Sequence, residues 1–239
     1  MGKYYVFGKT NSGDVMSLYS KKPMDFSYKA DRTAGFKEIQ RDFNFKFKRV
    51  KAITWQAHSD EVVIVDDDNV TKEIKSGDAL LTNLKGVGLE IRTADCLSIF
   101  LYDPVKKVIG NVHSGWKGTQ KQIVVKAVEK MVEYYGCNKE DIIACFNPSI
   151  MKCCFEVRDD VINLFKEVCD VEKYSQKNED NTYMFDLVSF NYDKLIETGL
   201  KKENIVLSNI CTACNTEDYH SYRKENNTEG RNLALICLK

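Results

Sequence analysis

The hydrophobic positions of this chain follow two alternating patterns, which predict strands and helices in turn. Short runs rich in β-branched and aromatic residues, such as KYYVFG near the start and EVVIVDD at 61–67, predict strands. LSIFLYD and KKVIGNVH predict two more, separated by the turn residues Asp103 and Pro104. EDIIACFN, IVLSNIC and NLALICL predict further strands later in the chain.

Between these runs, apolar residues recur every three or four positions, a period that predicts amphipathic helices. QKQIVVKAVEKMVEYYG places its apolar residues on one helical face, and Gly136 is expected to end that helix. RDDVINLFKEVC and VSFNYDKLIETG show the same period, and the latter is expected to end at its glycine, Gly199. The alternation of strands and helices predicts an α/β or α+β fold in which helices flank a mixed β-sheet. We expect one compact domain over residues 1–239.

Composition and charge disfavour several classes of protein. The 239 residues are 43% hydrophobic and 29% charged, which is typical of a globular protein rather than a disordered one. Lysine plus arginine and aspartate plus glutamate each number 35, so the chain lacks the basic surplus of a nucleic-acid-binding domain. No apolar run approaches the roughly 18 residues of a transmembrane helix, and the start lacks a signal-peptide pattern. We therefore expect a cytoplasmic protein without nucleic-acid or membrane partners, of undetermined oligomeric state.

Nine cysteines in a chain without a secretion signal favour reduced thiols over a disulfide framework. Two groups stand out, CTAC at 211–214 and the adjacent pair in CCFEV at 153–157. We interpret both as structural, because no second Cys-x-x-Cys pair completes a zinc site and adjacent cysteines are expected to point in different directions. A redox pair is the alternative for CTAC, if Cys211 begins a helix.

Three residues of types that bind metals lie at the ends of predicted strands. His58 precedes one predicted strand, Cys96 precedes another, and His113 ends a third, within NVHSGWKGT. Two imidazoles and one thiolate are ligands that zinc accepts, with a fourth position left for water or substrate. The competing interpretation is a buried small cysteine and unrelated histidines, because the spacing matches no compact zinc-finger motif.

Six separated segments occur here in the order typical of the YfiH/YlmD family: QAHSDEVVIVD, GDALLTN, RTADCLSIFLYD, NVHSGWKGT, PSIMKCCFEV and SYRKENNTEGRNLALI. From about residue 50 to the C-terminus the chain therefore resembles that family, which has been called laccase-like or multicopper polyphenol oxidase and, later, purine nucleoside phosphorylase. In the family the positions of His58, Cys96 and His113 bind zinc. The resemblance also implies a mixed-sheet fold first grouped with putative cysteine hydrolases.

The family's activities are phosphorolysis of adenosine, inosine and 5′-methylthioadenosine, and hydrolytic deamination of adenosine. The resemblance thus implies purine nucleosides and phosphate as partners and Zn²⁺ as cofactor, although a His/Cys site would also bind Cu²⁺ in vitro. For proton transfer we select Asp95, for which structural support of Cys96 is an equal alternative. Gln56 is a candidate for bonding the purine edge.

Phosphate or ribose contacts are assigned to basic residues near the same segments. Arg223 and Arg231 flank a glycine-containing turn, and guanidinium groups bind phosphate through paired hydrogen bonds. Lys117, in a position where the family more often has arginine, joins them. The alternative for these side chains is that they are solvated loop charges.

Departures from the family pattern support a second reading, a weakly active or inactive metal-binding regulatory protein. Residues 1–50 match the family's opening strand and glycine-rich loop poorly, and Asn147 stands where a glycine is usual. A Cys/His hydrolase using Cys96 and His113 is a minor alternative. Laccase chemistry is disfavoured, because a multicopper oxidase needs many histidines and this chain has three.

Overall fold

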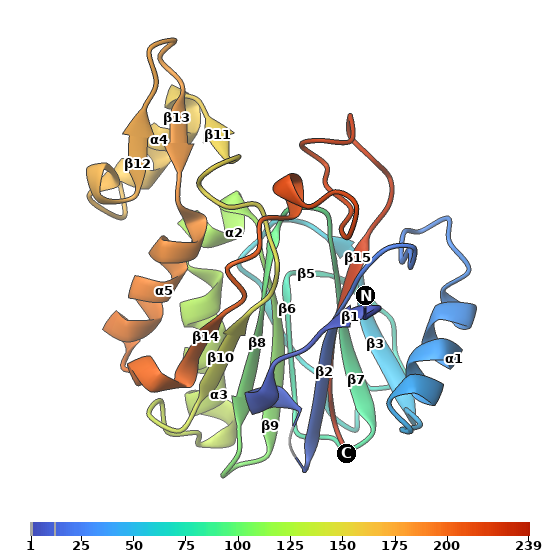
Figure 1. Cartoon of the computed structure of the whole chain (residues 1–239). Helices are drawn as coiled ribbons and strands as arrows, with labels where there is room; N and C mark the ends of the chain where they lie inside the picture. Colours follow the sequence, from blue (N-terminus) through green and yellow to red (C-terminus); the bar gives the residue numbers. More distant parts are fainter. Residues whose placement is uncertain (1, 12) are drawn as a thin grey trace.

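Two six-stranded sheets stack face to face at the centre of the molecule (Figure 1). The computed structural model describes residues 2–11 and 13–239. In spatial order the first sheet contains β1 (Tyr4–Tyr5), β2 (Val15–Ser20), β15 (Asn232–Leu238), β7 (Val87–Thr93), β3 (Arg49–Gln56) and β5 (Ile74–Gly77). The second contains β14 (Ile205–Leu207), β10 (Ile143–Phe146), β8 (Leu97–Asp103), β9 (Val108–Ser114), β6 (Ala79–Thr82) and β4 (Val62–Ile64).

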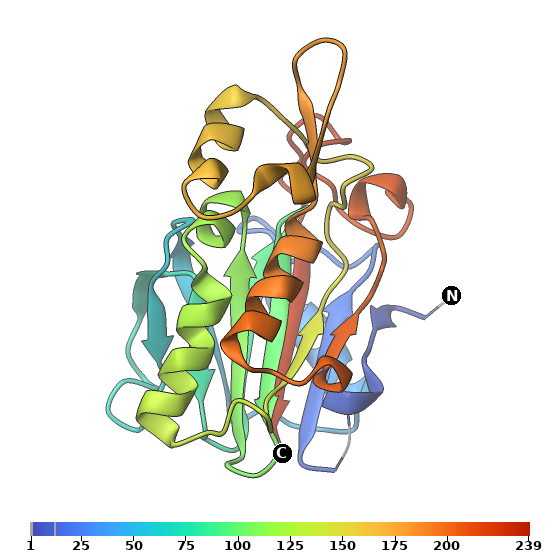
Figure 2. The same cartoon turned by 90° about the vertical axis from the view of Figure 1, so that its left-hand side faces the viewer.

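Helices cover the outer face of each sheet and so complete a four-layer arrangement. The helix α1 (Arg32–Asp42) packs on the first sheet, and α3 (Ile123–Tyr135) and α5 (Leu187–Thr198) pack on the second. Figure 2 shows α3 and α5 side by side across the second sheet. The shorter elements are α2 (Trp116–Gln120), α4 (Asp159–Lys166), η1 (Gly8–Thr10), η2 (Val171–Lys173), η3 (Lys202–Asn204), η4 (Thr212–Cys214) and a small sheet of β11 (Glu156–Val157), β13 (Tyr183–Phe185) and β12 (Ser175–Lys177).

The central strands are apolar on both faces because both faces are covered. In β8, Ile99 and Leu101 pack against the helices, whereas Phe100 and Tyr102 pack toward the first sheet. This double burial explains why LSIFLYD lacks the alternation of a half-exposed strand. The described residues include no helix long and apolar enough to cross a membrane.

The elements predicted from the sequence are present, and their ends follow local rules. Gly136 and Gly199 end α3 and α5 with backbone φ angles of 65° and 112°, in the left-handed region that glycine adopts without strain. The mixed α/β class is confirmed, but the single expected sheet is two stacked sheets. Strand patterning cannot reveal this, because it does not show which strands pair.

Sheet topology determines where a site can form. The connections β3–β4, β5–β6 and β7–β8 each cross from the first sheet to the second. They do so at one end of the molecule, because β3 is parallel to both β5 and β7. The end of β9 reaches the same place, since Ser98 of β8 pairs with His113. Four chain segments that are distant in sequence therefore meet at this end.

Close packing between β9 and its neighbours gives a direct test of the core. A Cβ added at Gly110 would lie 2.7 Å from the Leu81 Cδ2 atom and 3.2 Å from the Leu101 Cβ atom. We expect Gly110→Ala to lower the free energy of unfolding by about 1–3 kcal/mol in denaturant titrations. The control is Gly8→Ala, where no atom lies within 4 Å and we expect a change below about 0.5 kcal/mol. Equal stability of the two variants would contradict this packing.

Candidate metal centre and pocket

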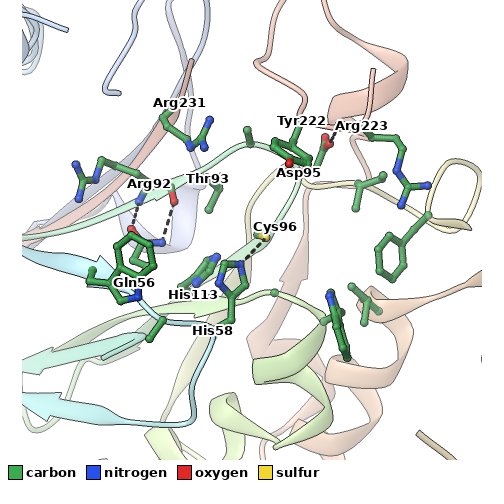
Figure 3. Close-up of a pocket in the computed structure, with 18 of the residues that line it drawn as sticks. Gln56, His58, Arg92, Thr93, Asp95, Cys96, His113, Tyr222, Arg223 and Arg231 are labelled. Atoms are coloured by element: carbon green, nitrogen blue, oxygen red, sulfur yellow. Dashed lines mark hydrogen bonds between the residues drawn. The ribbon is translucent and has the colours of Figure 1, made fainter. Parts of the chain in front are cut away.

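A pocket of about 610 Å³ opens at the end of the molecule where the crossovers meet (Figure 3). This volume lies within the range of small-molecule sites. Aromatic, basic and metal-binding side chains share its wall, which is formed by Tyr28, Trp55, Gln56, Ala57, His58, Arg92, Thr93, Ala94, Asp95, Cys96, His113, Gly115, Trp116, Ile150, Phe155, Leu187, Tyr222, Arg223 and Arg231.

The three metal-binding residues selected from the sequence converge at the base of this pocket. His58 follows β3, Cys96 lies between β7 and β8, and His113 lies near the end of β9. One ligand atom from each lies within 4.8 Å of the other two. The Cys96 Sγ atom is 3.9 Å from His58 Nε2, and the two imidazole rings are edge-on with centroids 4.9 Å apart (Figure 3).

The local packing fits a metal ion held by these three side chains. Gly115 begins the loop after β9, and a Cβ there would lie 2.8 Å from His58 Cδ2 and 3.2 Å from Cys96 Sγ. Only glycine leaves room for both ligands at this point. Two imidazoles and one thiolate form a donor set that leaves one coordination position open, as in catalytic zinc sites.

Asp78, which the sequence analysis did not assign, holds this centre together. Its buried carboxylate is 2.8 Å from His113 Nδ1 and accepts the backbone N–H of His58 at 3.1 Å. It also accepts the N–H and the hydroxyl of Ser59, at 2.6 and 2.7 Å. Because Nδ1 is occupied, His113 presents Nε2 to the metal position, an arrangement common among metal-binding histidines. The only sequence signal was the segment GDALLTN, which contains this aspartate without indicating its role.

The ligand side chains polarise one another. Burial raises the pKa of the Cys96 thiol, but hydrogen bonds from His113 and His58 outweigh burial and lower that pKa to about 6. Burial lowers the pKa of His113, but its bonds to Asp78 and Cys96 raise it to about 9. The metal-free centre therefore favours a thiolate beside an imidazolium. A cation bound here would meet a deprotonated sulfur and would displace the imidazole proton.

Two residues of the site adopt backbone conformations that non-glycine residues rarely adopt. His58 has a φ of 55° and Asp95 a φ of 80°. Such conformations cost free energy and persist only where surrounding contacts fix them. Asp78 fixes the His58 loop, and a second set of hydrogen bonds fixes the Asp95 loop.

Asp95 is buried, and its carboxylate accepts hydrogen bonds from other parts of the chain. Thr212 Oγ1 donates to one oxygen at 2.7 Å, while Ser221 Oγ and the Arg223 backbone N–H donate to the other at 3.0 and 2.7 Å. The Asp95 carbonyl oxygen accepts the N–H of Ile150 at 2.8 Å. These contacts favour the structural alternative for Asp95, and proton transfer stays a prediction.

Gln56 lines the pocket, and both ends of its amide bond the backbone of Arg92. Gln56 Nε2 donates to the Arg92 carbonyl at 2.9 Å, and Gln56 Oε1 accepts the Arg92 N–H at 3.0 Å. The Arg92 guanidinium in turn lies 4.0 Å from the centre of the Tyr28 ring. The side chain of Gln56 is therefore fixed, and its contact with a purine stays a prediction.

Of the three basic residues predicted to bind phosphate or ribose, the structure places two at the pocket and one outside it. Arg223 and Arg231 line the pocket, whereas Lys117 lies outside its wall, with Nζ 5.4 Å from the Trp116 ring. Arg223 donates to the Cys154 and Glu156 carbonyls at 3.2 and 3.0 Å. Arg231 Nη1 donates to two backbone carbonyls, each at 2.8 Å. These bonds fix both guanidinium groups at the rim without using all their donors.

Three exposed aromatic side chains that the sequence analysis did not select surround the pocket opening. Trp55, Tyr28 and Tyr222 are 67%, 63% and 49% exposed and belong to the pocket wall. Exposed aromatic rings grouped at one opening are typical of a surface that stacks planar ligands. No spacing rule identifies them, because they come from three separate segments.

The sequence predicted that the cysteines of CTAC and CCFEV form no shared group of metal-binding side chains, and this prediction was wrong. Cys153, Cys154, Cys211 and Cys214 place their sulfur atoms within 4.8 Å of one another, outside the pocket wall. Adjacent cysteines point in opposite directions only in an extended strand, whereas here a turn bends the chain, with the Cys154 N–H bonded to the Met151 carbonyl. All nine cysteines are free thiols.

The role of Asp78 can be tested through metal affinity. We expect Asp78→Asn to weaken metal binding about 10–100-fold in competition with a chromophoric chelator, because His113 and the His58 loop lose their shared anchor. The matched control is Asp60→Asn, whose carboxylate pairs with Lys126 at the surface. Unchanged affinity in Asp78→Asn would contradict the anchoring role.

Comparison with known proteins places this arrangement in a family. The family model described as multi-copper polyphenol oxidoreductase laccase matches residues 21–239. Purine nucleoside phosphorylase YlmD of Bacillus subtilis is 35% identical over 167 residues, which cover 70% of this chain and 60% of that protein. The purine nucleoside phosphorylase of Borreliella burgdorferi is 35% identical over 98% of this chain and 95% of its own length.

Two further similarities extend this comparison. Adenosine deaminase RL5, from an unknown prokaryotic organism, is 31% identical over 77% of this chain and 73% of its own length. The crystal structure of the hypothetical protein YfiH of Bacillus licheniformis superposes with a TM-score of 0.89 at 24% identity, covering 99% of this chain and 97% of that one. This chain therefore belongs to the multi-copper polyphenol oxidoreductase laccase family, whose relatives include the YfiH and YlmD proteins.

Proposed function

We propose that this protein is a zinc-dependent purine nucleoside phosphorylase that acts on adenosine, inosine and 5′-methylthioadenosine, with adenosine deamination as a second activity. The observation that carries the proposal is a single pocket that combines a His/His/Cys centre, an aromatic rim and two fixed arginines. The names of the relatives, which include both phosphorylases and a deaminase, support the same substrate class.

The dimensions and lining of the pocket suit a nucleoside with a phosphate ion. A volume of about 610 Å³ holds both. Trp55, Tyr28 and Tyr222 offer ring faces against which a planar purine stacks, and stacking tolerates changes of exocyclic group. That tolerance agrees with a substrate range that includes both adenosine and inosine. Gln56 is our candidate for bonding the purine edge.

Phosphate binding is assigned to the two arginines of the rim. Arg223 and Arg231 are held by carbonyl groups, so their remaining N–H donors are already oriented when the ion arrives. Oriented donors stabilise an anion beside the sugar while the purine departs with negative charge. Lys117, outside the pocket wall, is retained only as an accessory charge that attracts the anion.

His58, Cys96 and His113 would hold the zinc ion. When bound, zinc supplies Lewis-acid chemistry and lowers the pKa of a coordinated water, which suits both purine activation and deamination. Asp78 keeps His113 in the tautomer that leaves Nε2 free for the metal. Laccase chemistry remains disfavoured, because the chain has three histidines, of which His220 lies outside the pocket wall and bonds the Met24 carbonyl. Cu²⁺ would still bind the centre in vitro.

Metal content and activity together test the proposal. We expect wild-type protein to release base from adenosine and inosine only when phosphate is present, and ammonia production would assign deamination. His58→Ala, Cys96→Ala and His113→Ala should each remove zinc from this centre and lower kcat/KM by about 100-fold or more, because the Lewis acid is lost. His220→Ala is the control and should keep both zinc and turnover. Bound zinc without turnover of any nucleoside would contradict the enzyme assignment and favour the regulatory alternative.

The variant Asp95→Asn separates the two candidate roles of this residue, structural support and proton transfer. We expect Asp95→Asn to lower the free energy of unfolding by about 1–3 kcal/mol, because a neutral amide with one oxygen replaces a carboxylate whose two oxygens accept three hydrogen bonds. Its KM for phosphate should rise together with the loss of stability, since the hydrogen bonds that anchor the Arg223 segment are weakened. A fall in kcat of about 100-fold or more, with unchanged stability and an altered pH profile, would instead assign proton transfer to Asp95.

A further inference from the structure

Four cysteines outside the pocket wall form a second cluster of metal-binding groups. Cys153 and Cys154 lie in the turn before β11, Cys211 directly precedes the short helix η4, and Cys214 is the last residue of that helix. The pairs are far apart in sequence, and an isolated β-bridge between Ser149 and Cys211 brings their segments together. We propose that these four cysteines bind a zinc ion that ties the two segments to each other.

The distances between sulfur atoms fit one tetrahedral ion. All four sulfur atoms lie within 4.8 Å of one another. Cys214 Sγ lies 3.7 Å from Cys153 Sγ and 3.4 Å from Cys154 Sγ. In a tetrahedral zinc site with Zn–S bonds of about 2.3 Å, neighbouring sulfur atoms are about 3.8 Å apart. The cluster therefore needs only side-chain adjustments to receive the ion.

The backbone near the cluster also suits bound thiolates. The Met151 N–H donates to Cys211 Sγ at 3.5 Å, a contact that stabilises a negatively charged sulfur. The Arg223 guanidinium, which bonds the Cys154 carbonyl, places a positive charge beside the excess negative charge of a four-thiolate site. Cys211 is buried, whereas Cys153 and Cys214 are exposed, so the ion can enter from solvent.

A metal explains the cluster better than a disulfide does. A single disulfide, for example between Cys154 and Cys214, would use only two of the four cysteines, and the structure holds all four as free thiols. Convergence of four thiols from two segments on one point is instead typical of structural zinc sites, which have four protein ligands and no open position. The sulfur-only donor set also distinguishes this cluster from the His/His/Cys centre of the pocket.

A zinc ion at the four cysteines would act as a clamp behind the pocket wall. The turn at Cys153 and Cys154 leads directly into Phe155, which lines the pocket. The helix η4 carries Thr212, which bonds the Asp95 carboxylate. The clamp would thus fix two supports of the pocket without touching a substrate, which is the role of a structural metal.

Metal analysis of the full-length chain, purified under reducing conditions and reconstituted with zinc alone, tests this proposal. We expect about two zinc ions per chain for the wild type, one in the pocket and one in the four-cysteine cluster. The double variant Cys153→Ser/Cys214→Ser should retain about one zinc ion and lose part of its thermal stability. Both changed residues are exposed, so the variant is expected to fold. Cys169→Ser, outside both centres, is the matched control and should keep both ions.

The variant His58→Ala distinguishes failure of this proposal from failure of the proposed function, because it removes only the zinc of the pocket. His58→Ala should also retain about one zinc ion, and its cobalt-substituted form should show the strong sulfur-to-cobalt charge-transfer bands of a four-thiolate site. Those bands should disappear when Cys153→Ser/Cys214→Ser is added. Wild-type protein with a single zinc ion that only His58→Ala removes would overturn the proposal. Iron in place of zinc, or a disulfide in the cluster detected by mass spectrometry of reduced and untreated protein, would also overturn it.

Discussion

The carboxylate of Asp78 is the constraint on which the pocket depends. It lies at a crossover between the sheets and bonds His113, the backbone of His58 and both donor groups of Ser59. A buried carboxylate is stable only when such donors surround it, so the fold and the metal centre stabilise each other. Asp95 repeats this arrangement on the neighbouring crossover, where it bonds the segments that carry Thr212, Ser221 and Arg223.

The stacked sheets would allow one pocket to serve the several reactions that we propose. Its candidate metal ligands lie at or beside strand ends, whereas Tyr28, Tyr222, Arg223 and Arg231 of its rim come from loops and Trp55 comes from β3. In the proposed function, the same centre would activate either a leaving purine or a water molecule, depending on which substrate the rim admits. In our account the four-cysteine cluster is a third anchor of the pocket, after Asp78 and Asp95. It would hold the turn whose Cys154 carbonyl bonds Arg223.

The sequence predicted much of this arrangement because several signals are local. Periodicity predicted α3 and α5, and glycine predicted their ends. Strand ends and resemblance together selected His58, Cys96 and His113, which the structure brings together. Asp78 was missed because its role arises only when the start of β6 lies beside the end of β9. The aromatic rim was missed because its side chains come from three separate segments. The four-cysteine cluster depends on a turn and a β-bridge, neither of which a Cys-x-x-Cys rule detects.

Diffraction from zinc-loaded crystals, recorded on both sides of the zinc absorption edge, tests the central claim most directly. The account predicts an anomalous peak at about 2.0–2.3 Å from His58 Nε2, His113 Nε2 and Cys96 Sγ. It also predicts that His113 Nδ1 still bonds Asp78 and that the ion faces the aromatic rim. A map without a peak among these three side chains, or one in which Asp78 itself binds the metal, would contradict the account.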